Sequence, residues 1–138
     1  MRMTAAVLSL LLSAGAQAED VQALTAEGLA LIPPFQQQLL ETVKAAMQAG
    51  GPLKAVEACQ LQAPLIAAEH SRAPWRVGRT SLLVRNPANA ADAWEHDVLR
   101  QFAQRAAAGE PLANMQHSAV VAGEVRVMQA IAVGEPCL

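Results

Sequence analysis

Hydrophobic side chains in the first half of the chain recur at helical spacing. Four of them follow one another every four residues: Phe35, Leu39, Val43 and Met47. Side chains spaced in this way lie on one face of an α-helix. We therefore expect residues 20–49 to be helical, with a break at Pro33-Pro34 and an end at Gly50-Gly51.

A second helical pattern covers residues 52–70. Pro52 stands where a new helix can begin, because the first turn does not need the N–H that proline lacks. One stripe of this helix is expected to be buried, and it consists of Leu53, Val56, Cys59, Ala63 and Ile66. Pro64 removes the hydrogen bond to the carbonyl of Gln60, so we expect a kink one residue beyond Cys59.

The spacing changes from helical to alternating at residues 79–85, R-T-S-L-L-V-R. Thr80, Leu82 and Val84 alternate there with the other side chains, as in a half-buried β-strand. Asn86-Pro87-Ala88-Asn89 follows and predicts a turn, because a residue before proline is kept out of the helical region.

The last third of the chain predicts one more helix and a β-hairpin. Asp92 and Glu95 have the spacing of a capping box. A helix is therefore expected over roughly 93–107, with Gly109 as its stop. Its inward residues are expected to be Trp94, Val98 and Phe102. Residues 118–133, S-A-V-V-A-G-E-V-R-V-M-Q-A-I-A-V, predict two strands about a turn at Gly123. This order of elements indicates an α+β fold in which helices pack on an antiparallel sheet.

The first 18 residues have the pattern of a secretory signal peptide. They contain one positive charge, Arg2, then an apolar run and Ala16-Gln17-Ala18. Small residues at these alternate positions are typical of a signal-peptidase site, and the run is shorter than the roughly 20 residues that span a bilayer. We expect cleavage after Ala18, a domain of residues 19–138, a periplasmic or secreted location, and no membrane span in this chain.

Composition and charge exclude several classes of function. The net charge of −2 comes without a basic stripe, which argues against nucleic-acid binding. The sequence shows no serine elbow, glycine-rich phosphate loop or paired carboxylates, so we do not expect an enzyme. With two Phe, two Trp and no Tyr, the core must consist mainly of Ala, Leu, Val and Ile. Such a core leaves room for a flat aromatic cofactor, and it is also common in alanine-rich proteins.

The two cysteines, Cys59 and Cys137, allow three interpretations. Cysteines of an exported chain often pair in a disulfide. Cys59 also fits a small hydrophobic residue packed in its helix. A covalent haem needs Cys-x-x-Cys-His, of which this sequence holds only Cys137 and Leu138. Spacing alone does not decide between them.

Histidines and arginines supply the other candidate groups. His70, His96 and His117 lack the spacing of a helical metal pair, so we expect surface or capping positions for them. Arg79 and Arg85 are expected on one face of the predicted strand, which is either a solvated face or a pair that holds an anionic ligand.

Three strings of the sequence together resemble one protein family. They are A-V-E-A-C-Q-L-Q-A-P, G-R-T-S-L-L-V-R-N-P-A-N-A-A-D-A-W-E and V-M-Q-A-I-A-V-G-E-P-C-L. In this order they resemble the DUF3365 family, the Tll0287-like haem domains of bacterial exported proteins and sensor ectodomains. The similarity extends over nearly the whole chain after residue 18, and its middle string is the most specific.

The resemblance implies a PAS-like α+β fold and a c-type haem. In haem-binding members the terminal C-L continues as C-L-x-C-H-G, so Cys137 would be the first thioether cysteine, and we expect the natural sequence to continue beyond Leu138. Cys59 matches the family cysteine expected as axial iron ligand, opposite a histidine that this sequence does not include. We assign Arg79 to a haem propionate from its charge and its predicted strand face.

These expectations lead to a function and an alternative to it. The first is an exported c-type haem protein for electron transfer or for redox or gas sensing, with Cys/His ligation and a redox or signalling partner protein. Thiolate ligation favours ferric iron and hence a low reduction potential. The alternative is a haem-free PAS-like ligand-binding or sensory module, which binds a small organic ligand near Arg79 and Arg85 or a partner protein, with Cys59 and Cys137 as structural thiols or a disulfide.

Overall fold

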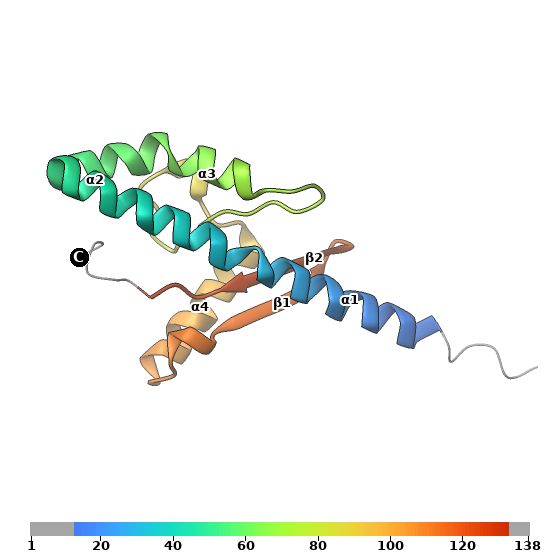
Figure 1. Ribbon diagram of the computed structural model, residues 1–138. Coiled ribbons are helices and arrows are strands. Elements are labelled where there is room, and N and C mark those ends of the chain that lie inside the picture. Colours follow the sequence, from blue (N-terminus) through green and yellow to red (C-terminus); the bar gives the residue numbers. More distant parts are fainter. Residues whose placement is uncertain (1–12, 133–138) are drawn as a thin grey trace, which may run out of the picture.

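Helices pack on both faces of a β-hairpin (Figure 1). The computed structural model describes residues 13–132. Its elements are α1 (Ser13–Ala30), α2 (Ile32–Leu61), α3 (Ala63–His70), the 3₁₀ turn η1 (Pro87–Asn89), α4 (Ala93–Ala107), the 3₁₀ turn η2 (Leu112–Asn114), β1 (Gln116–Val121) and β2 (Glu124–Gln129). Val127 of β2 faces α1, whereas its neighbour Met128 packs on the core beneath α4. The predicted α+β class is confirmed.

The helices are interrupted at Gly50-Gly51 as predicted, and close to the other two predicted positions, at Leu31 instead of Pro33-Pro34 and at Gln62 instead of Gln60. The first break is at Leu31, directly before Ile32 and the two prolines. Gly51 has φ 72°, which glycine adopts without strain, and there α2 turns back on itself. We call residues 32–49 the first arm of α2 and residues 52–61 its second arm. A third break at Gln62 separates α2 from α3, two residues before Pro64.

The buried face of the second arm differs from the prediction. Ala55 and Ala58 are buried, whereas Leu53 is 86% and Val56 44% exposed. The two arms therefore pack through small side chains, which a search for large hydrophobic residues does not find. Only Ile66, in α3, is a fully buried member of the predicted stripe, and Cys59 is half-buried.

The predicted strand at residues 79–85 is wrong. The chain there is irregular, apart from one bridge between Ser81 and Ala90. The hydroxyl of Thr80 donates to the carbonyl of Asn89 (2.8 Å), and that of Ser81 donates to the carbonyl of Leu83 (2.7 Å). Such local bonds compete with a sheet ladder. The predicted turn at Asn86–Asn89 is confirmed as η1.

The predictions for the last third are confirmed in most respects. The helix at 93–107 is α4, with the Asp92 and Glu95 capping box at its start. Gly109 follows its end with φ 88°, and the hairpin turn at Ala122-Gly123 has positive φ at both residues. The strands pair from Gln116 with Gln129 to Val121 with Glu124. β2 ends earlier than expected, although the N–H of Ala130 still donates to the carbonyl of Met115 (2.9 Å). The sheet formed by the described residues has two strands, and the PAS-like arrangement is not confirmed.

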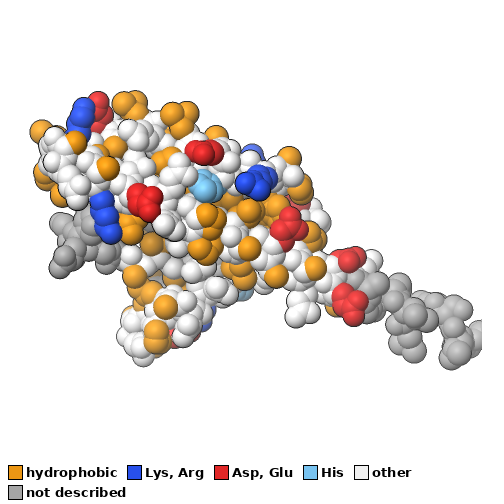
Figure 2. Space-filling model, viewed as in Figure 1, with side chains coloured by type: hydrophobic (Ala, Val, Ile, Leu, Met, Phe, Trp, Pro, Cys, Tyr) orange, Lys and Arg blue, Asp and Glu red, His pale blue; other side chains and the backbone are white. Residues whose placement is uncertain are grey.

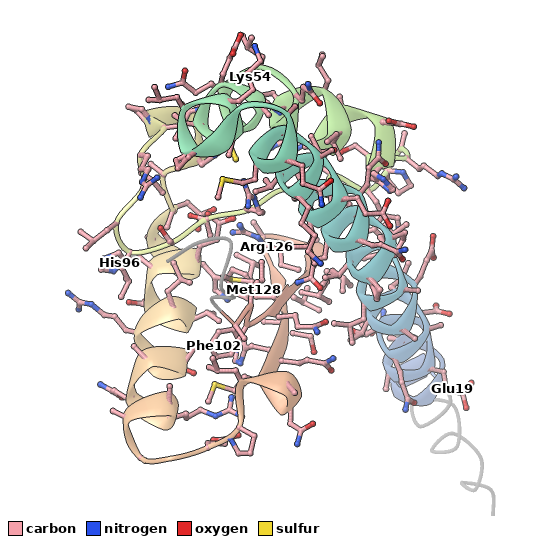
Figure 3. The ribbon with its side chains drawn as sticks, turned by 60° about the vertical axis from the view of Figure 1, so that its left-hand side comes forward. Glu19, Lys54, His96, Phe102, Arg126 and Met128 are labelled. Carbon is pink, nitrogen blue, oxygen red and sulfur yellow. The ribbon has the colours of Figure 1, made fainter. Side chains whose placement is uncertain are left out.

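Two hydrophobic clusters form the core. One joins α2 and α3 and contains Phe35, Leu39 and Ile66, with Val77 packed against it. The other lies between α4 and the hairpin and contains Val98, Phe102 and Met115, with Trp94 and Met128 packed against it (Figure 3). Val98 and Phe102 are thus buried as predicted, and Trp94 is half-buried.

Candidate functional site

Cys59 lies in the second arm of α2, three residues before the break at Gln62. Its side chain is half-buried, and three alanines lie within four residues of it: Ala55, Ala58 and Ala63. Cys59 forms no disulfide within the described residues. Cys137 lies outside those residues, so both its predicted role and its pairing with Cys59 stay predictions.

Arg79 and Arg85 lie in the irregular segment between α3 and η1. Both side chains are exposed, and neither forms an ion pair with a carboxylate in residues 13–132. Because the segment is not a strand, the argument that placed them on one sheet face does not hold. Val77, two residues before Arg79, packs on the cluster of α2 and α3, which keeps this part of the segment against the helices.

Two of the three histidines, His70 and His117, contact other side chains. Nε2 of His70 lies 2.6 Å from Oε1 of Gln38, and the His70 ring meets Phe35 edge-on. His117 lies against Trp94, with the ring centroids 5.8 Å apart. Within the part of the chain that the structure describes, no three His, Cys, Asp or Glu side chains gather as a metal site would require. Residues 13–132 thus contain one thiol, Cys59, and no cluster of three such side chains.

A groove of about 540 Å³ runs between the two arms of α2. Its lining includes Thr42, Ala45, Ala49, Ala58 and Leu61. Hydrophobic side chains are also exposed over α2 and α3 around it, among them Leu53, Leu61 and Leu65 (Figure 2). Neither Cys59 nor the two arginines line this groove, so it does not match the arginine-lined cavity expected of a haem-free module.

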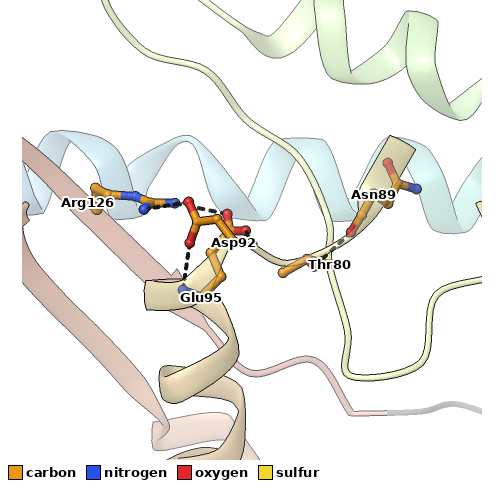
Figure 4. A network of polar contacts seen from close by, with 5 residues as sticks. All are labelled: Thr80, Asn89, Asp92, Glu95 and Arg126. Atoms are coloured by element: carbon orange, nitrogen blue, oxygen red, sulfur yellow. Dashed lines mark hydrogen bonds and ion pairs between the residues drawn. The ribbon is translucent and has the colours of Figure 1, made fainter. Parts of the chain in front are cut away.

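Arg126 holds the start of α4 against β2 (Figure 4). Its guanidinium pairs with the carboxylates of Asp92 (2.8 Å) and Glu95 (3.1 Å), and it lies 4.5 Å from the centroid of the Trp94 ring. Asp92 and Glu95 also cap α4, each accepting the backbone N–H of the other at 2.8 Å. The Glu95 N–H, and after it the Arg126 guanidinium, hold the pKa of Asp92 below its ordinary value.

A separate set of contacts closes the segment before α4. The bond from Thr80 to Asn89 and the bridge from Ser81 to Ala90 close residues 80–90 into a loop, which ends two residues before Asp92. The N–H of Ala88 donates to the side chain of Asn86 (3.0 Å) and fixes the turn within it. The sequence indicated Asp92 and Glu95 as a cap, but Arg126 was missed, because its partners lie more than 30 residues away.

The comparison with known proteins agrees with the resemblance seen in the three sequence strings. The family model described as Tll0287-like matches residues 11–138. No curated protein and no solved structure matches the chain. Among residues 13–132, no helix combines the length and the apolar character that crossing a membrane requires.

Proposed function

The chain belongs to the Tll0287-like family, and on this premise we propose that it is an exported c-type haem protein. Its function would be electron transfer, or sensing of redox state or of a small gas. Cys59 is the proposed axial ligand, Cys137 the proposed first thioether cysteine and Arg79 a proposed contact of a propionate. A bound haem supplies an iron that changes oxidation state or binds a gas molecule.

The surroundings of Cys59 are the observation that carries the proposal. The thiol is half-buried and engaged in no disulfide with the described residues, and alanines precede and follow it on its helix. Small side chains let a flat ring approach a helix closely. The helix that carries Cys59 ends at the break at Gln62, three residues beyond the thiol.

The direction of β2 supports a second attachment point near this helix. Gly28, near the end of α1, lies against Val127, near the end of β2. From there the first arm of α2, with 18 residues at about 1.5 Å each, runs on for about 27 Å. The second arm then returns in the opposite direction (Figure 1). In Figures 1 and 3 the turn of α2 and the end of β2 lie toward the same side of the molecule. Cys137 is seven positions beyond Ala130, and a chain of this length spans at most about 24 Å.

The exposure of α1 supports removal of the first 18 residues. Gln17, Ala18, Glu19 and Asp20 are all exposed, and the first half-buried side chain with a described environment is Val21. Cleavage after Ala18 would therefore leave the packed part of α1 intact. A chain exported to the periplasm or beyond and cleaved there would keep this fold.

Spectra of the gene product extended by its natural codons would test the proposal. We expect, after co-expression with a haem-attachment system, a Soret band that survives acid-acetone extraction, and a low reduction potential. Cys59→Ala should keep the attached haem but shift its spectrum and raise its potential, whereas Cys137→Ala should reduce the attachment. The matched control Ser118→Ala, on the exposed face of β1, should change neither. A colourless extended protein would overturn the proposal in favour of a haem-free module.

A further inference from the structure

The contacts of Arg126 join two parts of the chain that lie far apart in the sequence, the start of α4 and strand β2. The closed loop of residues 80–90 directly precedes the start of α4. The loop reaches Asp92 through only Ala91, so the position of the Asp92 carboxylate sets where the loop ends. Arg126 fixes that carboxylate relative to β2.

The contact is more specific than a surface ion pair. Isolated exposed ion pairs contribute little to stability. Here, however, one guanidinium meets two carboxylates and the face of Trp94, and the Arg126 side chain is only 25% exposed. A planar guanidinium can satisfy two acceptors and stack on an aromatic ring at the same time, which an ammonium group cannot do.

We propose that Arg126 is a positioning residue, which fixes the strand leading to Cys137 in relation to the loop that follows Arg79. This inference rests on the proposed function where it concerns haem. It also gives the family-specific string a structural meaning. Thr80 and Asn89 close the loop, while Asp92, Trp94 and Glu95 contact Arg126, so the role of these residues is to build the frame of the proposed site.

Arg105, which lies in α4, provides a matched control for Arg126. It pairs with the carboxylate of Glu110 and lies 5.8 Å from the centroid of the Phe102 ring, so it also combines an ion pair with an aromatic neighbour. It stands in the last turn of α4, whereas Asp92 and Glu95 stand at the start. Loss of its pair should not reach the loop.

Hydrogen exchange of the chain in its present length tests the coupling without haem. In Arg126→Gln we expect the amides of Ala88, Asn89 and Ala90, which are hydrogen-bonded within the loop, to exchange about tenfold faster. Arg105→Gln should change them less than about twofold. Arg126→Lys keeps the positive charge but replaces the planar guanidinium, which bonds two carboxylates at once, by an ammonium group. Its loop amides should therefore exchange about as fast as those of Arg126→Gln. Unchanged loop exchange in both Arg126 variants would overturn the proposal.

The potential of the extended, haem-loaded protein tests the consequence for the site. Arg126→Lys should shift the reduction potential of the haem, whereas Arg105→Lys should leave it unchanged. An equal potential in wild type and Arg126→Lys would overturn the positioning role in the site. Absence of haem from the wild type would instead contradict the proposed function, and the exchange measurement would still decide whether Arg126 couples loop and strand.

Discussion

The ring of Trp75 lies directly over Gly28, and a β-carbon placed on Gly28 would come within 2.7 Å of it. The indole N–H also donates to the carboxylate of Glu27 (3.0 Å). The Cγ2 atom of Val127, in β2, lies 3.0 Å from the same β-carbon position. Helix α1, the segment after α3 and the hairpin therefore meet at a point where only glycine fits.

Gly28→Ala should destabilise the fold. The new methyl group meets a ring and a strand side chain that other contacts hold in place, so we expect a loss of about 1–3 kcal/mol in the free energy of unfolding. Urea unfolding measures it. Gly78→Ala is the control, because nothing lies within 4 Å of a β-carbon there. Equal losses in the two variants would contradict the close packing.

Asp92→Asn should flatten the acid limb of the stability curve. The pKa of Asp92 is lower in the folded protein than in the unfolded chain, so its carboxylate stabilises the fold above the unfolded pKa. This contribution is lost as the pH falls below about 4 through the folded pKa. Asparagine is an equally good N-cap, so the variant isolates the charge. Unfolding midpoints between pH 3 and 7 measure the effect.

Asp97→Asn serves as the control for this experiment, since it removes one negative charge from the same helix at an exposed position. Its curve should run parallel to that of the wild type. If Asp92→Asn also ran parallel, the ion pair with Arg126 would not contribute to the pH dependence.

Cys59→Ala should cost less than about 1 kcal/mol in the free energy of unfolding. The side chain is half-buried, and alanine is the best helix former. Ala55→Leu, at a buried position of the same arm that does not line the groove, should cost about 1–3 kcal/mol, because a larger side chain overpacks a buried site. A large loss from Cys59→Ala in urea would show that the cysteine serves packing, and would weaken its assignment as a ligand.

A chain that begins at Glu19 should unfold at the same urea concentration as the full chain. The described side chains before Val21 are exposed, so their removal costs no packing. A chain that begins at Leu29 should be markedly less stable, since it lacks the packed turns of α1 that include Gly28. A clear loss on removal of residues 1–18 alone would contradict the proposed processing.

Local signals in the sequence predicted most of the elements. The Asp92 and Glu95 cap, Gly109 and the turn at Gly123 each act within a few residues, and all are found. Alternation misled the prediction for 79–85, because the hydroxyls of Thr80 and Ser81 bond to the backbone of their own loop. The alanine contact between the arms of α2 and the partners of Arg126 depend on distant segments, which no local pattern encodes. The family resemblance was confirmed, whereas the roles of Cys59, Cys137 and Arg79 stay proposals.

The alternation of side chains along β2 restricts how the hairpin can move relative to the helices. Val127 faces Gly28 on one side, and Arg126 meets Asp92 and Glu95 on the other. A slip of the strand by one residue would exchange its two faces and break both sets of contacts at once. Strand β2 therefore keeps a single register relative to α1 and α4 and does not shift along its own axis. Any larger movement within the fold is therefore expected in the helices and loops around the hairpin, with β2 as the fixed reference.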